Sequence, residues 1–136
     1  MGQQQLLLLV IGLIIVAIAV LAGISAFEVK FKQSVVDNLV DRNLSIATDA
    51  VFWKTKRDPF SGGNAEYTGL ATDGMTTLFL GETTEIGTFK ITKATADELE
   101  ITAVSNRFPD IGVRTYVTDY SIDSTSVSYT GGFTLE

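Results

Sequence analysis

Residues 6–27 form an almost unbroken apolar run, and the first charged side chain in the chain is Glu28. A helix of about 20 apolar residues is long enough to cross the hydrocarbon core of a bilayer. No proline precedes Pro59, and no glycine lies between Gly23 and Gly62. The sequence therefore predicts one helix running from the apolar segment into the residues that follow, roughly 77 Å from Leu6 to Lys56 at 1.5 Å per residue.

Beyond Phe27 the helical pattern becomes one-sided. Apolar residues recur at spacings of three and four, which places them on one stripe of a helix. We expect the helix to end near Arg57, because Asp58-Pro59 and the glycines that follow interrupt helices. The residues expected to pack a head against this stripe are Phe31, Val35, Leu39, Val40, Leu44, Ala47, Val51 and Trp53.

Small residues are spaced along the apolar run, at Gly12, Gly23 and the alanines between and after them. Small side chains allow helix backbones to approach closely where lipid supplies no hydrophobic drive for association. Gly23, with Ser25, is also the expected place for a bend or local unwinding. The residues expected to pack between copies of the helix are Gln5, Leu6, Leu9, Gly12, Leu13, Val16, Val20, Gly23 and Phe27.

The rest of the chain is β-like, with apolar residues alternating with polar ones on either side of a turn at 94–97. We expect a turn at Asp123-Ser124 between a second pair of strands. The predicted strands are 76–80, 87–93, 99–103, 112–122, 125–129 and 133–135. The fold class is α+β: a long N-terminal helix, hydrophobic and then amphipathic, packed on a small C-terminal antiparallel sheet. Its parts are residues 1–27, 28–57 and 58–136.

The net charge of −6 is unevenly distributed. Residues 28–57 carry six basic and four acidic side chains, whereas residues 58–136 carry four basic and twelve acidic ones. A basic stalk and an acidic head favour contact between subunits, although an ordinary solvated surface explains the same charges. No basic patch is interleaved with aromatic residues, so we expect no nucleic-acid binding.

The sequence contains no pattern typical of catalysis, and we expect a protein that is not an enzyme and needs no cofactor or metal. The chain has no cysteine and no histidine, which removes the commonest nucleophile–base pairs. Asp97, Glu98 and Glu100 flank a predicted turn and are expected to form a solvated rim. Asp119 and Asp123 lack the spacing of a calcium loop. The glycosylation triplet at Asn43 lies in a predicted helix, and we interpret it as a chance match.

The N-terminal segment has no basic leader region and no small-residue cleavage site, so we expect no cleaved secretory signal. Lys30 and Lys32 flank only the C-terminal end of the apolar run. By the positive-inside rule this alone puts the head in the cytoplasm, and a basic leader removed before Met1 would reverse that assignment.

An apolar N-terminal helix, an amphipathic extension, a loop and then an antiparallel sheet resemble the type IV pilins and pilin-like proteins. The family's processing site has a glycine, then phenylalanine or methionine, and a glutamate four residues further on. Here the fifth position is Gln5 if Met1 is the first mature residue, or Leu6 if Gly2 is. A neutral amide shares hydrogen bonds with neighbouring helices at a lower desolvation cost than a charge. The chain also lacks the cysteines that close the C-terminal region of many pilins.

The resemblance implies a structural subunit that polymerises with identical copies into an extracellular type IV pilus-like filament. It implies storage in the inner membrane before assembly, an assembly machinery with an export platform and a cytoplasmic ATPase, and a role in adhesion, attachment, motility or DNA uptake. Two alternatives stay open. One is a single-span membrane-anchored surface protein whose β head binds a partner, and the other is a pseudopilin of a secretion system.

Overall fold

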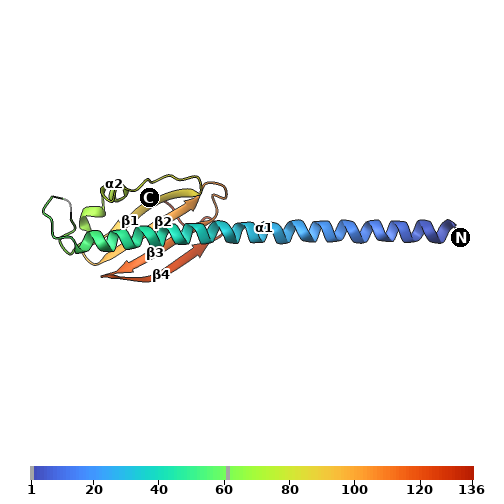
Figure 1. Ribbon diagram of the computed structural model, residues 1–136, viewed down its shortest axis with the longest axis horizontal. Coiled ribbons are helices and arrows are strands. Elements are labelled where there is room, and N and C mark those ends of the chain that lie inside the picture. The colour runs from blue at the N-terminus through green and yellow to red at the C-terminus, as the bar shows by residue number, and fades with distance from the viewer. Residues whose placement is uncertain (1, 61) are drawn as a thin grey trace. The chain divides into compact units, whose positions relative to one another are not determined.

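The computed structural model describes residues 2–60 and 62–136 and has an α+β fold (Figure 1). The elements follow one another as α1 (Gly2–Thr55), the 3₁₀ turn η1 (Thr68–Leu70), α2 (Gly74–Thr77), β1 (Gly87–Ala94), β2 (Glu98–Ser105), β3 (Gly112–Thr118) and β4 (Ser121–Ser128). The chain forms two compact units, Met1–Ser34 and Val35–Glu136, so α1 contributes to both.

Helix α1 confirms the predicted continuous helix and ends two residues before Arg57. The predicted unwinding at Gly23 is wrong, because the helix is uninterrupted there. A single glycine costs only about 1 kcal/mol relative to alanine in a helix interior. The surrounding alanine, leucine and isoleucine residues all keep the helical conformation. After Thr55 the chain turns away, and the amide of Gly63 donates to the carbonyl oxygen of Trp53.

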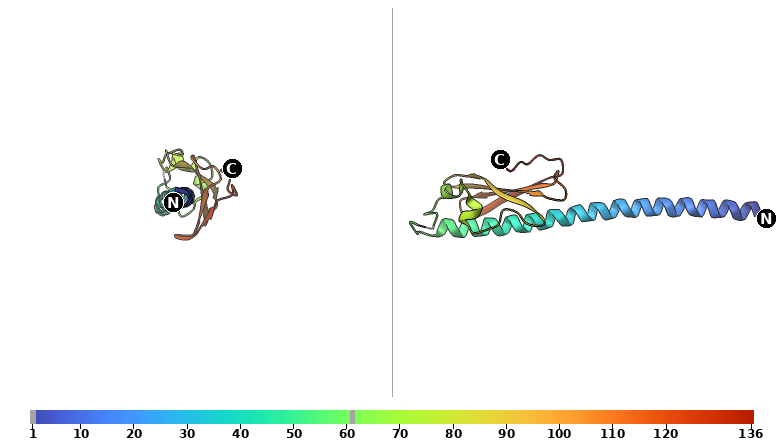
Figure 2. Two further views of the ribbon diagram at one scale, coloured as in Figure 1. Left: turned by 90° about the vertical axis from the view of Figure 1, so that its right-hand side faces the viewer. Right: turned by 90° about the horizontal axis from the view of Figure 1, so that it is seen from above.

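The four strands form an antiparallel sheet in the order β1-β2-β3-β4 (Figures 1 and 2). The hairpin of β1 and β2 confirms the alternation in the sequence: Phe89 pairs with Ala103 and Ile91 with Ile101, and all four are buried. In the second unit, the C-terminal part of α1 lies along one face of this sheet (Figure 2).

The turn between β3 and β4 lies at Asp119-Tyr120, so the prediction of a turn at Asp123-Ser124 is wrong. Thr118 pairs with Ser121 across the turn, and Asp119 has a positive φ of 55°, which aspartate tolerates better than most residues. Asp123 is the extra residue of a bulge, because Tyr116 pairs with Ser124 while Val117 pairs with Ile122. The polar pair in the sequence therefore indicated a bulge within a strand.

Two predicted strands are absent. Residues 76–80 instead contain the end of α2, which begins after Asp73 (φ 52°) and buries Met75. Residues 133–135 form no strand. Just before this segment, the amide of Gly131 donates to the backbone carbonyl oxygen of Asp110. Within it, the Phe133 ring lies 4.7 Å from the Arg114 guanidinium. In both places β-type composition lacked a strand partner, and a strand is stable only when it is paired.

The core of the second unit lies between α1 and the sheet. Leu39, Ile46 and Ala47 are fully buried on the helix, and Phe89, Ile101 and Val113 are fully buried on the sheet. Tyr67, Leu70 and Met75, from the segment that joins α1 to β1, belong to the same core. Of the helix stripe expected from the sequence, Leu39, Ala47 and Trp53 belong to this core.

Candidate functional site

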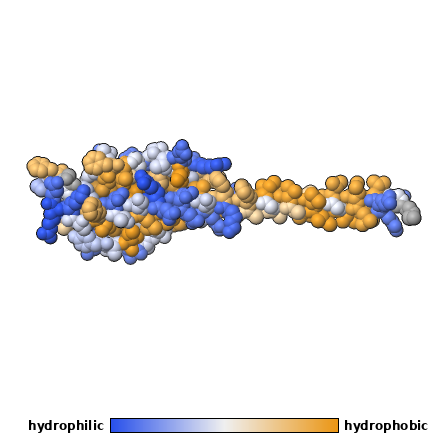
Figure 3. Space-filling model, in the orientation of Figure 1, coloured by the Kyte–Doolittle hydropathy of each residue, from blue (hydrophilic) through white to orange (hydrophobic). Residues whose placement is uncertain are grey.

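The apolar N-terminal half of α1 is the first candidate surface. Every residue from Gly2 to Lys30 is exposed, and the helix is long and apolar enough to cross a membrane by length and composition. Figure 3 shows apolar surface along the visible side of this part of the helix. The positions predicted to pack between copies all lie here: Gln5, Leu6, Leu9, Gly12, Leu13, Val16, Val20, Gly23 and Phe27.

The two glycines of residues 6–27 leave gaps on the helix surface. A Cβ added at Gly12 or Gly23 meets no atom within 4 Å outside the neighbouring helix backbone. Neither glycine is therefore required by a contact within the described chain.

The residues predicted to pack the head on the helix fall into three groups. Leu39, Ala47 and Trp53 are buried in the core of the second unit. Phe31 belongs to the first unit. The remaining positions, Val35, Val40, Leu44 and Val51, are half-buried.

Asn43 is a buried polar residue that the sequence analysis did not place in the core. Its Nδ2 atom donates to the carbonyl oxygens of Ile101 and Val113, each at 3.4 Å, so it ties α1 to β2 and β3. Its side chain is fully buried, which leaves no room for a glycan. The apolar pattern of the helix does not predict that Asn43 is buried. A buried polar side chain needs hydrogen-bond partners, and those of Asn43 come from strands far along the chain.

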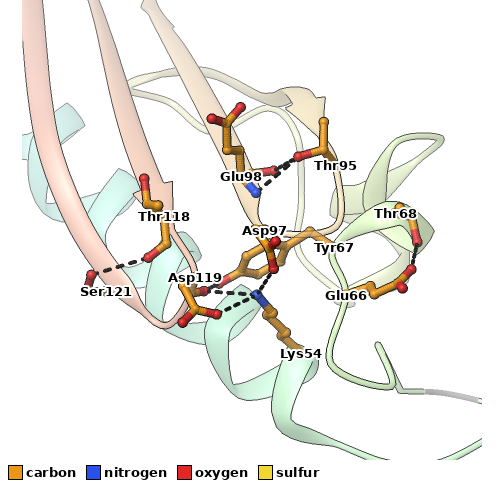
Figure 4. A network of polar contacts seen from close by, with 10 residues as sticks. All are labelled: Lys54, Glu66, Tyr67, Thr68, Thr95, Asp97, Glu98, Thr118, Asp119 and Ser121. Atoms are coloured by element: carbon orange, nitrogen blue, oxygen red, sulfur yellow. Dashed lines mark hydrogen bonds and ion pairs between the residues drawn. The ribbon is translucent and has the colours of Figure 1, made fainter.

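Lys54 is also a buried polar residue, and its side chain contacts residues from the turns of both hairpins (Figure 4). Its ammonium lies 3.2 Å from Asp119 Oδ1 and 3.5 Å from Asp97 Oδ1, in the turns of the two hairpins. The rings of Tyr67 and Tyr120 lie 4.5 and 4.6 Å from the same nitrogen. Two carboxylates and two aromatic faces offset the charge of a lysine whose side chain is fully buried.

Tyr67 completes this cluster. Its hydroxyl donates to the carbonyl oxygen of Asp119 at 2.6 Å. Burial, reinforced by the negative charge of Asp119, raises the pKa of Tyr67 to about 12. These contacts join the end of α1 and Tyr67 to the β1–β2 and β3–β4 turns, so the cluster stabilises the packing of these elements.

The carboxylates near the first hairpin turn do not share one environment. Asp97 and Glu98 are exposed, as expected for a solvated rim. The bond between Glu98 and Lys93, at 2.7 Å, lowers the pKa of Glu98 and raises the pKa of Lys93. Glu100 is half-buried and contacts Arg114 Nε at 3.1 Å, so the expectation of a solvated position is wrong for this residue. Its partner Arg114 lies on the next strand, β3, so the pattern of residues around Glu100 does not indicate this ion pair.

Within residues 2–60 and 62–136 no group of three or more acidic side chains is arranged to hold a metal ion. A hollow of about 230 Å³ on the sheet is lined by Lys93, Glu98, Tyr116 and Asp123 among others, and a second of about 240 Å³ lies beside Phe52, Trp53 and Phe79. Both are open at the surface.

In comparisons with known proteins, no family model, no curated protein and no solved structure matches this chain. The architecture is nevertheless pilin-like: a long N-terminal helix, apolar in its first half, and a small antiparallel sheet packed on its second half.

Proposed function

We propose that this protein is a structural subunit that polymerises through the apolar half of α1 into an extracellular filament of the type IV pilus kind. The observation that carries the proposal is the apolar surface around residues 6–27, where Leu6 is 63% and Phe27 73% exposed. Apolar surface on this scale needs lipid or protein around it. Identical helices supply that cover in a filament, and the sheet-bearing units form its outer layer.

The two glycines favour protein over lipid as the final surroundings. Gly12 and Gly23 weaken an isolated helix, and neither relieves a contact within the described chain. Small residues on one face allow close approach of neighbouring helices, where van der Waals contacts accumulate. The protein is stored in a membrane as a monomer and passes from lipid to the filament during assembly.

The competing function is a single-span surface protein that stays in the membrane, favoured by the same apolar helix. Mechanical shearing of cells separates the two. A filament subunit appears in sheared, detergent-free material, and negative-stain microscopy shows fibres that an antibody against the protein labels. Protein that stays with washed membranes, with no labelled fibre, contradicts the proposal.

A further inference from the structure

The exposed face of α1 in the second unit is polar and acidic. One side of this part of the helix is covered by the sheet. The exposed side carries Asp37, Asn38, Asp41, Ser45, Thr48, Asp49 and Phe52. Because the sheet already covers the apolar side, this polar face is the part of the helix that remains open to other molecules.

Asp37 and Asp41 form an unfavourable pair on this face. Residues four apart lie next to each other on a helix, and like charges there destabilise it. In the described part of the chain neither carboxylate has an ion-pair partner. A positive charge from outside this copy would relieve the repulsion between the two carboxylates.

Lys30, in the first unit, is the complementary charge. It is exposed, and no ion pair is found for it within residues 2–60 and 62–136. Its neighbours Glu28 and Lys32 bond to each other at 3.0 Å. Helix side chains pair with residues three or four positions away, whereas Asp37 is seven and Asp41 eleven positions beyond Lys30. Along its own helix Lys30 therefore reaches neither carboxylate.

We propose that the face formed by Asp37 and Asp41 receives Lys30 of a second copy, shifted along the helix by seven to eleven residues. This inference rests on the proposed filament. It names the contact that fixes how far neighbouring copies are shifted along the helix axis. Apolar contact between helices is non-directional and tolerates sliding. Opposite charges fix the register, because a shifted copy places like charges together or leaves them unpaired.

Charge reversal tests the contact in the full chain. K30D alone, and D37K/D41K alone, should each lower the yield of sheared filaments by about tenfold or more, because each places like charges at the contact. The combined variant K30D/D37K/D41K restores opposite charges and should restore the yield. The matched control is K90D, which makes the same charge change at an exposed position on β1. Trp53 fluorescence checks folding in all variants.

Zero-length carbodiimide crosslinking tests the contact in wild-type filaments. It joins a lysine to a carboxylate only where the two touch. We expect mass spectrometry to find Lys30 linked to Asp37 or Asp41, and filaments grown from mixed light and heavy nitrogen copies should contain mixed-isotope links. Wild-type filaments without this link, or full yields from K30D, overturn the inference and leave the proposed function standing. Absence of any wild-type filament overturns the proposed function itself.

Discussion

At the scale of single residues, Trp53 is a large core side chain whose removal should destabilise the head. It is 8% exposed, and the backbones at Gly63 and Gly69 approach its ring so closely that a Cβ at either would lie 2.7 Å from a ring carbon. Trp53→Ala should lower the free energy of unfolding by about 3–5 kcal/mol. Chemical unfolding of the full chain in detergent, followed by circular dichroism, measures this.

The neighbouring Phe52 is the control for Trp53, because it is aromatic, adjacent and 63% exposed. Phe52→Ala should change the free energy of unfolding by no more than about 0.5 kcal/mol. Equal losses from the two variants would contradict the placement of Trp53 in the core.

Tyr67 makes a pH-dependent contribution. Its pKa in the folded protein, about 12, is above the ordinary value near 10, so the unfolded chain loses this proton first. The stabilisation is present below about pH 10 and is lost as the pH rises from about 10 towards 12. Unfolding midpoints measured at pH 9, 10, 11 and 12 should fall across this window. Tyr67→Phe, which cannot ionise, should show a smaller fall, and an identical fall would contradict the assignment.

At the scale of elements, the residues that a pattern could predict are those whose neighbours lie close in sequence. The apolar run and the three- and four-residue spacing that follows it predicted α1, and alternation predicted the β1–β2 hairpin. Asn43 and Lys54 could not be placed, because each is buried by groups from strands or turns far along the chain. The same reason explains residues 76–80, whose strand-like composition has no strand to pair with.

The apolar half of α1 can be tested as an element through Leu9, which is exposed and belongs to the first unit. Leu9→Lys places a charge where lipid or apolar helices must surround the chain, which is costly in either setting. We expect filaments to be lost while the second unit keeps its fold, because none of its core residues lies in residues 2–34. Near-UV circular dichroism checks the fold and microscopy of sheared material checks the filaments. Normal fibres from this variant would contradict burial of Leu9 in a filament.

At the scale of the whole molecule, the proposed function requires residues 6–27 to suit two surroundings, lipid before assembly and copies of the same helix afterwards. A substitution that is tolerated in lipid but prevents close packing of helices distinguishes these two surroundings. Gly12→Leu is such a change: it makes the helix more apolar, and a Cβ at this position meets no atom within 4 Å outside the neighbouring helix backbone.

We expect Gly12→Leu to leave the amount of protein in washed membranes unchanged and to remove the filaments from sheared material, because the larger side chain prevents close approach of a second helix. Gly12→Ala is the matched control, since a methyl group keeps the surface small and should preserve the filaments. Immunoblots of the two fractions measure both outcomes. If Gly12→Leu gives filaments at the wild-type level, no helix approaches closely at Gly12, and the argument that this glycine serves helix packing in the filament is wrong.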